Sequence, residues 1–213
     1  MQISQGDKTI IMGQIKVTYN LDDIEGLCII ESTIHVDNRG FFMETFNQND
    51  MYEAGLPINF VQDNHAMSIK GVLRGLHFQK HFFQTKLIRV IKGTVFDVAV
   101  DLRLDSKTFG KYHGEILSAD NKKQYLIPRG FAHGYLVLSD KAELYYKCDD
   151  FYHANDEGGI AWNDPAIGID WPGVIGEYTG SADASGYRLH DGTTLILSEK
   201  DQKWPGLKET LKF

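Results

Sequence analysis

The sequence predicts an all-β protein, folded as a sandwich or a barrel with a few short helices. Many short runs rich in β-branched and aromatic residues follow one another at close spacing, and glycine or proline residues separate them. Segments with the apolar period of a helix are few. Closely spaced strands with little helix between them are typical of sandwiches and barrels.

The first element with clear local signals is a short helix over residues 48–54. Asn47 or Asn49 can cap its first turn, because an asparagine side chain accepts hydrogen bonds from the free N–H groups there. Gly55 and Pro57 then end the helix, since neither residue continues a helical backbone well.

The strands are expected downstream of this helix, in residues 71–79, 86–91, 94–101, 124–138 and 142–147, with a Pro/Gly-rich turn inside the fourth of these segments. Only the Lys92-Gly93 turn separates the second segment from the third, which predicts a hairpin. Side chains alternate along a strand, so Asp97 shares one face with Val95 and Ala99. Asp97 is therefore expected among small apolar side chains.

Length and composition indicate a single domain over residues 1–213, since 24.1 kDa is enough for one well-packed β domain. We expect residues 1–15 to form an N-terminal tail. Residues 173–197 are rich in Gly, Ser, Asp and Thr, and we expect a loop insertion, either extended or with a small hairpin over residues 189–197.

Charge and targeting signals exclude several classes of partner. The formal net charge of −7 argues against nucleic acid, which needs a basic face. No run of eighteen apolar residues is present, so no membrane span is expected, and residues 1–13 lack the features of a signal peptide. Cys28 and Cys148 stand far apart without metal-ligand spacing, which favours reduced thiols in the cytoplasm.

Two polar residues interrupt an apolar strand, residues 71–79. Arg74 is cationic and His77 titrates near neutral pH, and both are costly to bury without partners. Other polar side chains recur in the strands that follow. We therefore expect a working site at this strand.

Several segments occur in an order that is characteristic of one enzyme family. They are residues 37–42 (DNRGFF), 62–65 (QDNH), 71–79 (GVLRGLHFQ), 86–103, 121–138 and 198–201 (SEKD). Together they resemble the dTDP-4-dehydrorhamnose 3,5-epimerase family over about residues 20–205. The resemblance implies a cupin-like jelly roll, a double-stranded β-helix, in a homodimer that needs no cofactor and no metal. It also implies inversion of C3 and C5 of dTDP-4-dehydro-6-deoxy-D-glucose, which gives dTDP-4-dehydro-L-rhamnose for cell-surface polysaccharides.

The chemistry explains the catalytic residues that the resemblance implies. Removing the hydrogen beside a ketone leaves an enolate, so inversion needs a base, a proton donor on the other face and a positive charge at the ketone oxygen. By the family match, His77 is the base and Asp201 is the carboxylate that orients it. Tyr146 matches the proton donor, and Lys86 matches the lysine that faces the C4 oxygen.

The same match implies the substrate-binding residues. Arg74 suits the pyrophosphate because its guanidinium is a fork of donors. Tyr152 is a candidate for stacking on the base, and Asp97 and His133 for orienting sugar hydroxyls or Lys86. Further contacts are expected from Gln62, Asp63, Asn64, Glu157 and Lys200, and from Arg39 and Glu44 of the neighbouring subunit.

Other functions stay open at this level. A metal-dependent cupin would carry a His-x-His pair, whereas Phe78 and Gln79 follow His77 and the next histidine is His81. A non-catalytic protein that binds sugar nucleotides is a second alternative. Within the enzyme class, inversion at C3 alone or another nucleotide-linked ketosugar is possible, and residues 173–197 either form a surface loop or fold over the sugar site.

Overall fold

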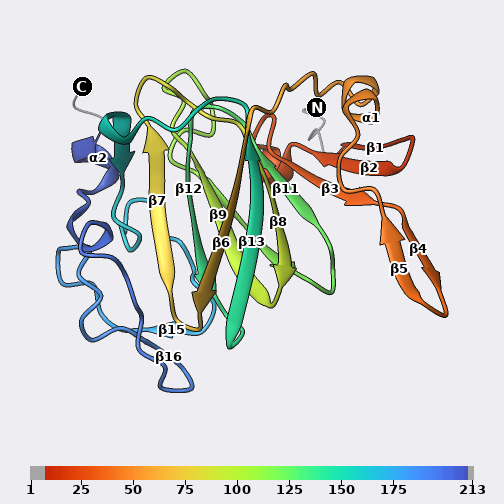
Figure 1. The fold of residues 1–213 in the computed structure, drawn as a ribbon. Coiled ribbons are helices and arrows are strands. Elements are labelled where there is room, and N and C mark those ends of the chain that lie inside the picture. Colours follow the sequence, from red (N-terminus) through yellow and green to blue (C-terminus); the bar gives the residue numbers. More distant parts are fainter. Residues whose placement is uncertain (1–7, 211–213) are drawn as a thin grey trace, which may run out of the picture.

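Two antiparallel β-sheets face each other in the computed structural model, which describes residues 8–210 (Figure 1). The larger sheet has seven strands in the order β1 (Lys8–Met12), β2 (Ile15–Tyr19), β3 (Cys28–Ser32), β11 (Gln124–Ile127), β8 (Lys86–Lys92), β13 (Lys141–Cys148) and β6 (Gln62–Ile69). The smaller sheet has five, in the order β10 (Tyr112–Ser118), β9 (Thr94–Asp101), β12 (Phe131–Val137), β7 (Leu73–Gln79) and β14 (Glu157–Gly159). The expected all-β jelly roll is therefore confirmed.

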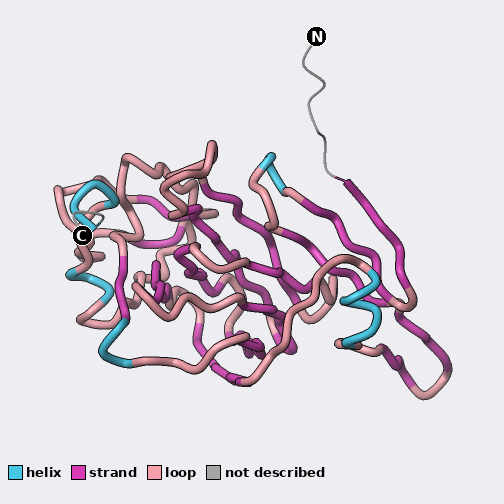
Figure 2. Tube along the Cα trace, turned by 90° about the horizontal axis from the view of Figure 1, so that it is seen from above, coloured by secondary structure: helices cyan, strands magenta, loops and turns pink. Residues whose placement is uncertain are grey.

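Short elements complete the fold. Two small antiparallel pairs join β4 (Ile34–Asp37) to β5 (Gly40–Met43) and β15 (Val174–Ile175) to β16 (Arg188–Leu189). The helices of the described residues are α1 (Gln48–Glu53), α2 (Leu207–Thr210) and the 3-10 turns η1 (Leu21–Asp23), η2 (Ala154–Asp156) and η3 (Asp201–Lys203). The β4–β5 hairpin projects from the body of the protein in both views (Figures 1 and 2). No described helix has the length and apolar character needed to cross a membrane.

The main core lies between the two sheets. Ile88 and Tyr125 enter it from the larger sheet, and Val95, Ala99 and Tyr135 enter it from the smaller one. Asp97 shares this inward face with Val95 and Ala99, as the alternation predicts. The space between the sheets is therefore apolar along most of its length and polar only where such residues enter.

Two further clusters cover the outer faces of the sheets. Helix α1 packs Met51 and Ala54 onto the outside of the larger sheet. On the outside of the smaller sheet, Trp162, Trp171 and Tyr187 pack together in the chain that follows β14. The central strands β9 and β12 of the smaller sheet are thus buried along their whole length or nearly so, whereas β6 at the edge of the larger sheet alternates with exposed side chains.

Helix α1 forms where its local signals place it. The Asn47 side chain accepts hydrogen bonds from the backbone N–H groups of Asn49 and Asp50, so Asn47 is the cap and Asn49 is not. The helix ends at Glu53 with Ala54 as its cap, and Gly55 follows with a φ of +81° that a residue with a Cβ rarely adopts.

The predicted hairpin over residues 86–101 is wrong. Strand β8 pairs with β11 and β13, whereas β9 pairs with β10 and β12, so the chain passes from one sheet to the other at Gly93. Gly93 has a φ of +76°, and a Cβ there would lie 2.0 Å from the Lys141 carbonyl oxygen. The turn was identified correctly, but it joins facing sheets and not neighbouring strands.

The expectation of an N-terminal tail needs correction. Residues 8–15 are not a tail, because β1 pairs with β2 at the edge of the larger sheet, where the Gln14 N–H donates to Asp50. Residues 1–7 lie outside the described residues. Residues 173–197 form the small β15–β16 ladder and a turn bridged between Arg188 and Thr194. The small hairpin expected over residues 189–197 is thus found in part, and the whole segment buries Ala182, Ala184 and Leu195 against the smaller sheet.

Candidate active site

A pocket of about 320 Å³ opens between the two sheets, next to the predicted site strand β7. Its walls are Gln62, Asn64, His77, Phe78, Gln79, Gln84, Lys86, Tyr146, Tyr152 and Glu157. These residues come from β6, β8 and β13 of the larger sheet, from β7 and β14 of the smaller one, and from the loops after β7 and β13. The fold thus brings seven of the fifteen proposed site residues to the wall of one cavity.

His77 and Asp201 form a close pair at this pocket. His77 Nε2 lies 2.5 Å from Asp201 Oδ1, although the two residues are 124 positions apart in the sequence. Burial by itself raises the pKa of Asp201, but the hydrogen bonds from His77, Ser198 and Trp204 outweigh burial and hold that pKa below its usual value. Because Nε2 is engaged with the carboxylate, Nδ1 is the nitrogen left to accept a proton.

A β-bulge decides which way the polar residues of β7 face. His77 pairs with His133 of β12, and Arg74 pairs with Tyr135, so β7 holds one more residue than β12 between these pairs. Simple alternation would place Arg74 and His77 on opposite faces. The extra residue resets the alternation, and Arg74 Nε lies 3.2 Å from Ser68 Oγ beside the pocket.

Lys86 and Tyr146 enter from the facing sheet. Burial lowers the pKa of Lys86, and the charges of Cys148, Asp97 and Glu157 act in the opposite direction. Burial also raises the pKa of Tyr146 to about 12, while the positive charge of Arg74 opposes this shift. Tyr146 therefore keeps its proton at neutral pH and can act as a donor.

A second histidine–carboxylate pair lies beside the first. His133 Nε2 is 2.9 Å from Asp97 Oδ1, and the Asp97 side chain is fully buried. Burial lowers the pKa of His133, the Asp97 carboxylate opposes this, and the charges of Lys86 and His77 lower the pKa further. His133 is therefore neutral, and the Asp97 charge lies close to Lys86.

Hydrogen bonds connect the residues at the rim of the pocket. The Glu157 carboxylate accepts from the Tyr152 hydroxyl at 3.1 Å and from Lys200 Nζ at 2.6 Å. The Tyr152 N–H donates to the Gln62 side chain, whose amide donates in turn to Asn64. These five predicted residues thus form one connected edge of the pocket.

Three further predicted residues have side-chain contacts only away from this pocket. The Asp63 side chain lies on the outer face of β6, where it accepts from the Tyr145 hydroxyl at 2.6 Å and from Lys147 Nζ at 2.9 Å. Side chains alternate along a strand, so the neighbours Gln62 and Asn64 point inward while Asp63 points outward. Arg39 pairs with Asp37 on the projecting hairpin, and Glu44 accepts from Asn47.

The structure also adds residues that sequence reasoning missed. Gln79 lies two positions after His77, so strand alternation could have placed it on the same face. Its amide group clamps the backbone of His153 through two hydrogen bonds of 2.8 and 2.9 Å. Trp204 donates its indole N–H to Asp201, and no signal in the sequence indicated this contact.

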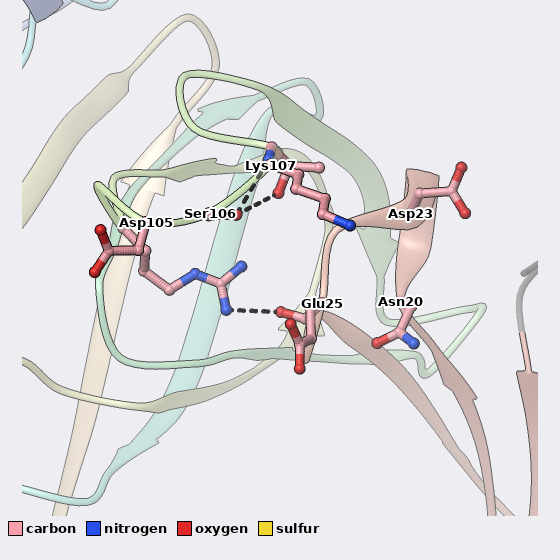
Figure 3. Close-up of a pocket in the computed structure, with 8 residues that line it drawn as sticks. Asn20, Asp23, Glu25, Asp105, Ser106 and Lys107 are labelled. Atoms are coloured by element: carbon pink, nitrogen blue, oxygen red, sulfur yellow. Dashed lines mark hydrogen bonds between the residues drawn. The ribbon is translucent and has the colours of Figure 1, made fainter.

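A separate pocket of about 610 Å³ lies between the β2–β3 and β9–β10 loops (Figure 3). Arg103 lines this pocket and donates to the Glu25 carbonyl oxygen. None of the predicted site residues lines this pocket. Among residues 8–210, no group of three His, Cys, Asp or Glu side chains is placed to hold a metal ion.

Comparison with known proteins agrees with this geometry. The family model of dTDP-4-dehydrorhamnose 3,5-epimerase matches residues 22–209. An epimerase of that name from Methanothermobacter thermautotrophicus is 49% identical over 186 residues, which cover 87% of this chain and 92% of the relative. One from Escherichia coli is 48% identical and covers 90% of this chain and 95% of the relative.

Solved structures show the same likeness. The Legionella pneumophila enzyme in complex with dTDP-4-keto-L-rhamnose is 47% identical, with a TM-score of 0.75 over 85% of this chain and 88% of that one. A 3'-monoepimerase from Streptomyces bikiniensis in complex with dTDP-quinovose is 29% identical, with a TM-score of 0.73 over 86% of this chain and 85% of that one. The resemblance stated from the motifs is thereby confirmed: the chain belongs to the dTDP-4-dehydrorhamnose 3,5-epimerase family.

Proposed function

We propose that this protein inverts C3 and C5 of dTDP-4-dehydro-6-deoxy-D-glucose without a cofactor and so makes dTDP-4-dehydro-L-rhamnose. One observation carries the proposal: His77 and Tyr146 line the same pocket but belong to facing sheets. A sugar ring held between the sheets therefore meets a base on one side and a proton donor on the other. Inversion of a carbon centre needs this arrangement.

The proton transfers follow from the residues. His77 Nδ1 takes the hydrogen from the carbon beside the ketone, and the electron pair of that bond moves to the C4 oxygen as an enolate. The Asp201 carboxylate stabilises the imidazolium that forms, and the Lys86 ammonium stabilises the enolate oxygen. Tyr146 then donates its proton to the opposite face of the carbon while the C4 carbonyl reforms. Solvent takes up the imidazolium proton and gives a proton back to the phenolate, which restores His77 and Tyr146.

The rim residues suit a nucleotide diphosphate. Arg74 offers a forked guanidinium next to the pocket, and Lys200 adds a second positive charge. Tyr152 presents an exposed aromatic ring suited to a base, and Gln62 and Asn64 present amide groups. We place the protein in the cytoplasm, because its cysteines are free thiols.

Exchange in heavy water tests the reaction directly. With the candidate ketosugar and the protein, NMR should show deuterium at both C3 and C5 of the recovered sugar, since each inversion passes through an enolate. Deuterium at C3 alone favours the second candidate, a C3 epimerase. The similarity to the 3'-monoepimerase supports this candidate. Deuterium at neither carbon refutes both.

We also propose a homodimer in which the β4–β5 hairpin reaches the partner subunit. A two-stranded hairpin is marginal alone in water, yet this one exposes 76% of Val36 and 70% of Phe42. A second copy that covers these side chains accounts for their exposure. The same contact would carry Arg39 and Glu44 to the partner's pocket, which explains why they do not face their own.

Sedimentation should therefore show a particle of twice the 24.1 kDa of one chain. Phe42→Asp should shift it to monomer and lower activity, because a charge on the hairpin opposes burial against the partner. Leu104→Asp is the matched control, since Leu104 is 74% exposed in the β9–β10 loop. A fully active monomer of the unaltered protein contradicts the proposal.

A further inference from the structure

We propose that Trp204 is a positioning residue for the His77–Asp201 pair: its indole N–H holds the Asp201 carboxylate in the orientation that His77 needs. The inference deepens the proposed function and rests on it. Trp204 contributes no group to the reaction itself, and it acts through Asp201.

The contacts of Trp204 reach both members of the pair. Trp204 Nε1 lies 3.3 Å from Asp201 Oδ1, the same oxygen that lies 2.5 Å from His77 Nε2. The rings of Trp204 and His77 meet edge to face, with centroids 6.4 Å apart and planes at 71°. One carboxylate oxygen therefore receives a donor from each ring.

Trp204 is itself held firmly. It directly follows η3, and its ring lies against Gly159 of β14, where a Cβ would be only 2.2 Å from the indole Cε2. Gly159 is also the residue that pairs with His77 across the sheet. The Pro205 carbonyl oxygen accepts from the Ala161 N–H at 2.8 Å, which ties the next residue to the same edge.

These contacts give the indole N–H a defined effect on the pair. Asp201 Oδ1 shares its negative charge between two donors, and loss of one leaves the carboxylate free to rotate and more attractive to the imidazolium proton. A higher pH is then needed to free the base. The other charged groups that face or flank the pair are Lys200, Glu157, Lys86, the His133–Asp97 pair, Glu199 and Lys203.

Trp204→Phe separates positioning from packing. Phenylalanine keeps an aromatic ring over Gly159 but has no N–H donor. We expect kcat to fall by about 10- to 100-fold, the factor for one hydrogen bond to a charged group, while KM changes by less than about threefold. The acid limb of the pH–rate profile should move upward by roughly 0.5 to 1 unit, with circular dichroism unchanged.

Trp171→Phe is the matched control. It makes the same exchange of side chains and loses an indole hydrogen bond of 2.9 Å, here to the Trp162 carbonyl oxygen in the outer cluster. It should lower thermal stability and leave the acid limb in place. Gly159→Ala gives a second variant, since an added methyl pushes the indole away from Asp201 and should move the acid limb in the same direction.

A readout without substrate keeps this inference distinct from the proposed reaction. In the unaltered protein, NMR should show the Trp204 indole N–H resonance moving through the same pH transition as the His77 ring protons, and the other two indole resonances should not follow it. Failure of the protein to act on the ketosugar removes the proposed function only. A Trp204 resonance that ignores the His77 transition, or an unchanged acid limb in Trp204→Phe, overturns the inference.

Discussion

The His77→Asn variant is expected to lose both epimerisation and the exchange of substrate hydrogen with solvent. The asparagine amide is polar like the imidazole, and its nitrogen takes about the place of Nδ1, although the side chain is too short to keep the contact that Nε2 makes with Asp201. An amide nitrogen is not a base, however, and no enolate forms without one. The loss should reach at least about 10²- to 10⁴-fold, the range for a general base.

Tyr146→Phe is the informative comparison, because it removes the donor and leaves the base. His77, Asp201 and Lys86 remain in place in this variant, so the enolate still forms and returns to the face that it came from. Substrate hydrogen should therefore exchange with solvent while little inverted product appears. The pKa of Tyr146, raised to about 12, keeps the phenol protonated throughout the neutral range in the unaltered protein.

Exchange and inversion should be measured by NMR on the same sample in heavy water, with circular dichroism to establish that both variants fold. The assigned roles are wrong if exchange and inversion fall in parallel in Tyr146→Phe while His77→Asn stays active. They are also wrong if His77→Asn still exchanges substrate hydrogen, because the base must then be another residue.

Lys86→Met should produce the second large effect, a fall in kcat of roughly 10²- to 10³-fold, the cost of removing one group that stabilises an oxyanion. Methionine has nearly the same length and no charge, so the ketone oxygen loses its positive partner. Exchange should fall together with inversion, since the enolate itself is destabilised. This parallel loss distinguishes Lys86 from Tyr146.

The pH dependence gives a further check on Lys86. Burial lowers its pKa below the ordinary lysine value of 10.5, so the catalytic ammonium is lost at a lower pH than that of an exposed lysine. Activity should decline on the alkaline side below pH 10.5. The unfolded chain binds this proton more tightly than the folded one, so Lys86 lowers stability at neutral pH, and this penalty disappears as the pH rises toward 10.5.

The thermal stability of Lys86→Met should therefore change less with alkaline pH than the thermal stability of the unaltered protein. Lys111→Met is the matched control, because Lys111 is exposed in the β9–β10 loop. It should leave kcat, the alkaline limb and the stability profile unchanged. Full activity of Lys86→Met, or an alkaline limb that persists in its residual activity, contradicts the role of Lys86 as the charge at the enolate.

Local signals in the sequence determined the elements whose causes are local. The α1 helix follows from a capping asparagine, Asn47, and a terminating glycine, Gly55, because both act within a few residues of the helix end. The strands β7, β8, β9, β11, β12 and β13 follow from their β-rich composition, and the inward face of Asp97 follows from alternation. The order of the motifs determined the family.

Tertiary structure decided what depends on distant partners. The turn at Gly93 has the same local residues whether it joins paired strands or facing sheets, and only the pairing of β8 with β13 and of β9 with β12 distinguishes them. The bulge in β7, which turns Arg74 and His77 to one face, exists only relative to β12. Neither feature is encoded in a short window of sequence.

The site shows the same division. Residue types and motif order predicted His77, Asp201, Lys86 and Tyr146, but the fold alone brings Asp201 within 2.5 Å of a histidine 124 positions away. The contact between Trp204 and Asp201 depends on how the indole ring packs against Gly159 of β14. A glycine has no side chain that would indicate such a contact in the sequence. Sequence determined the chemistry available to this protein, and packing between distant segments decided its geometry, because long-range contacts are made by the folded chain as a whole.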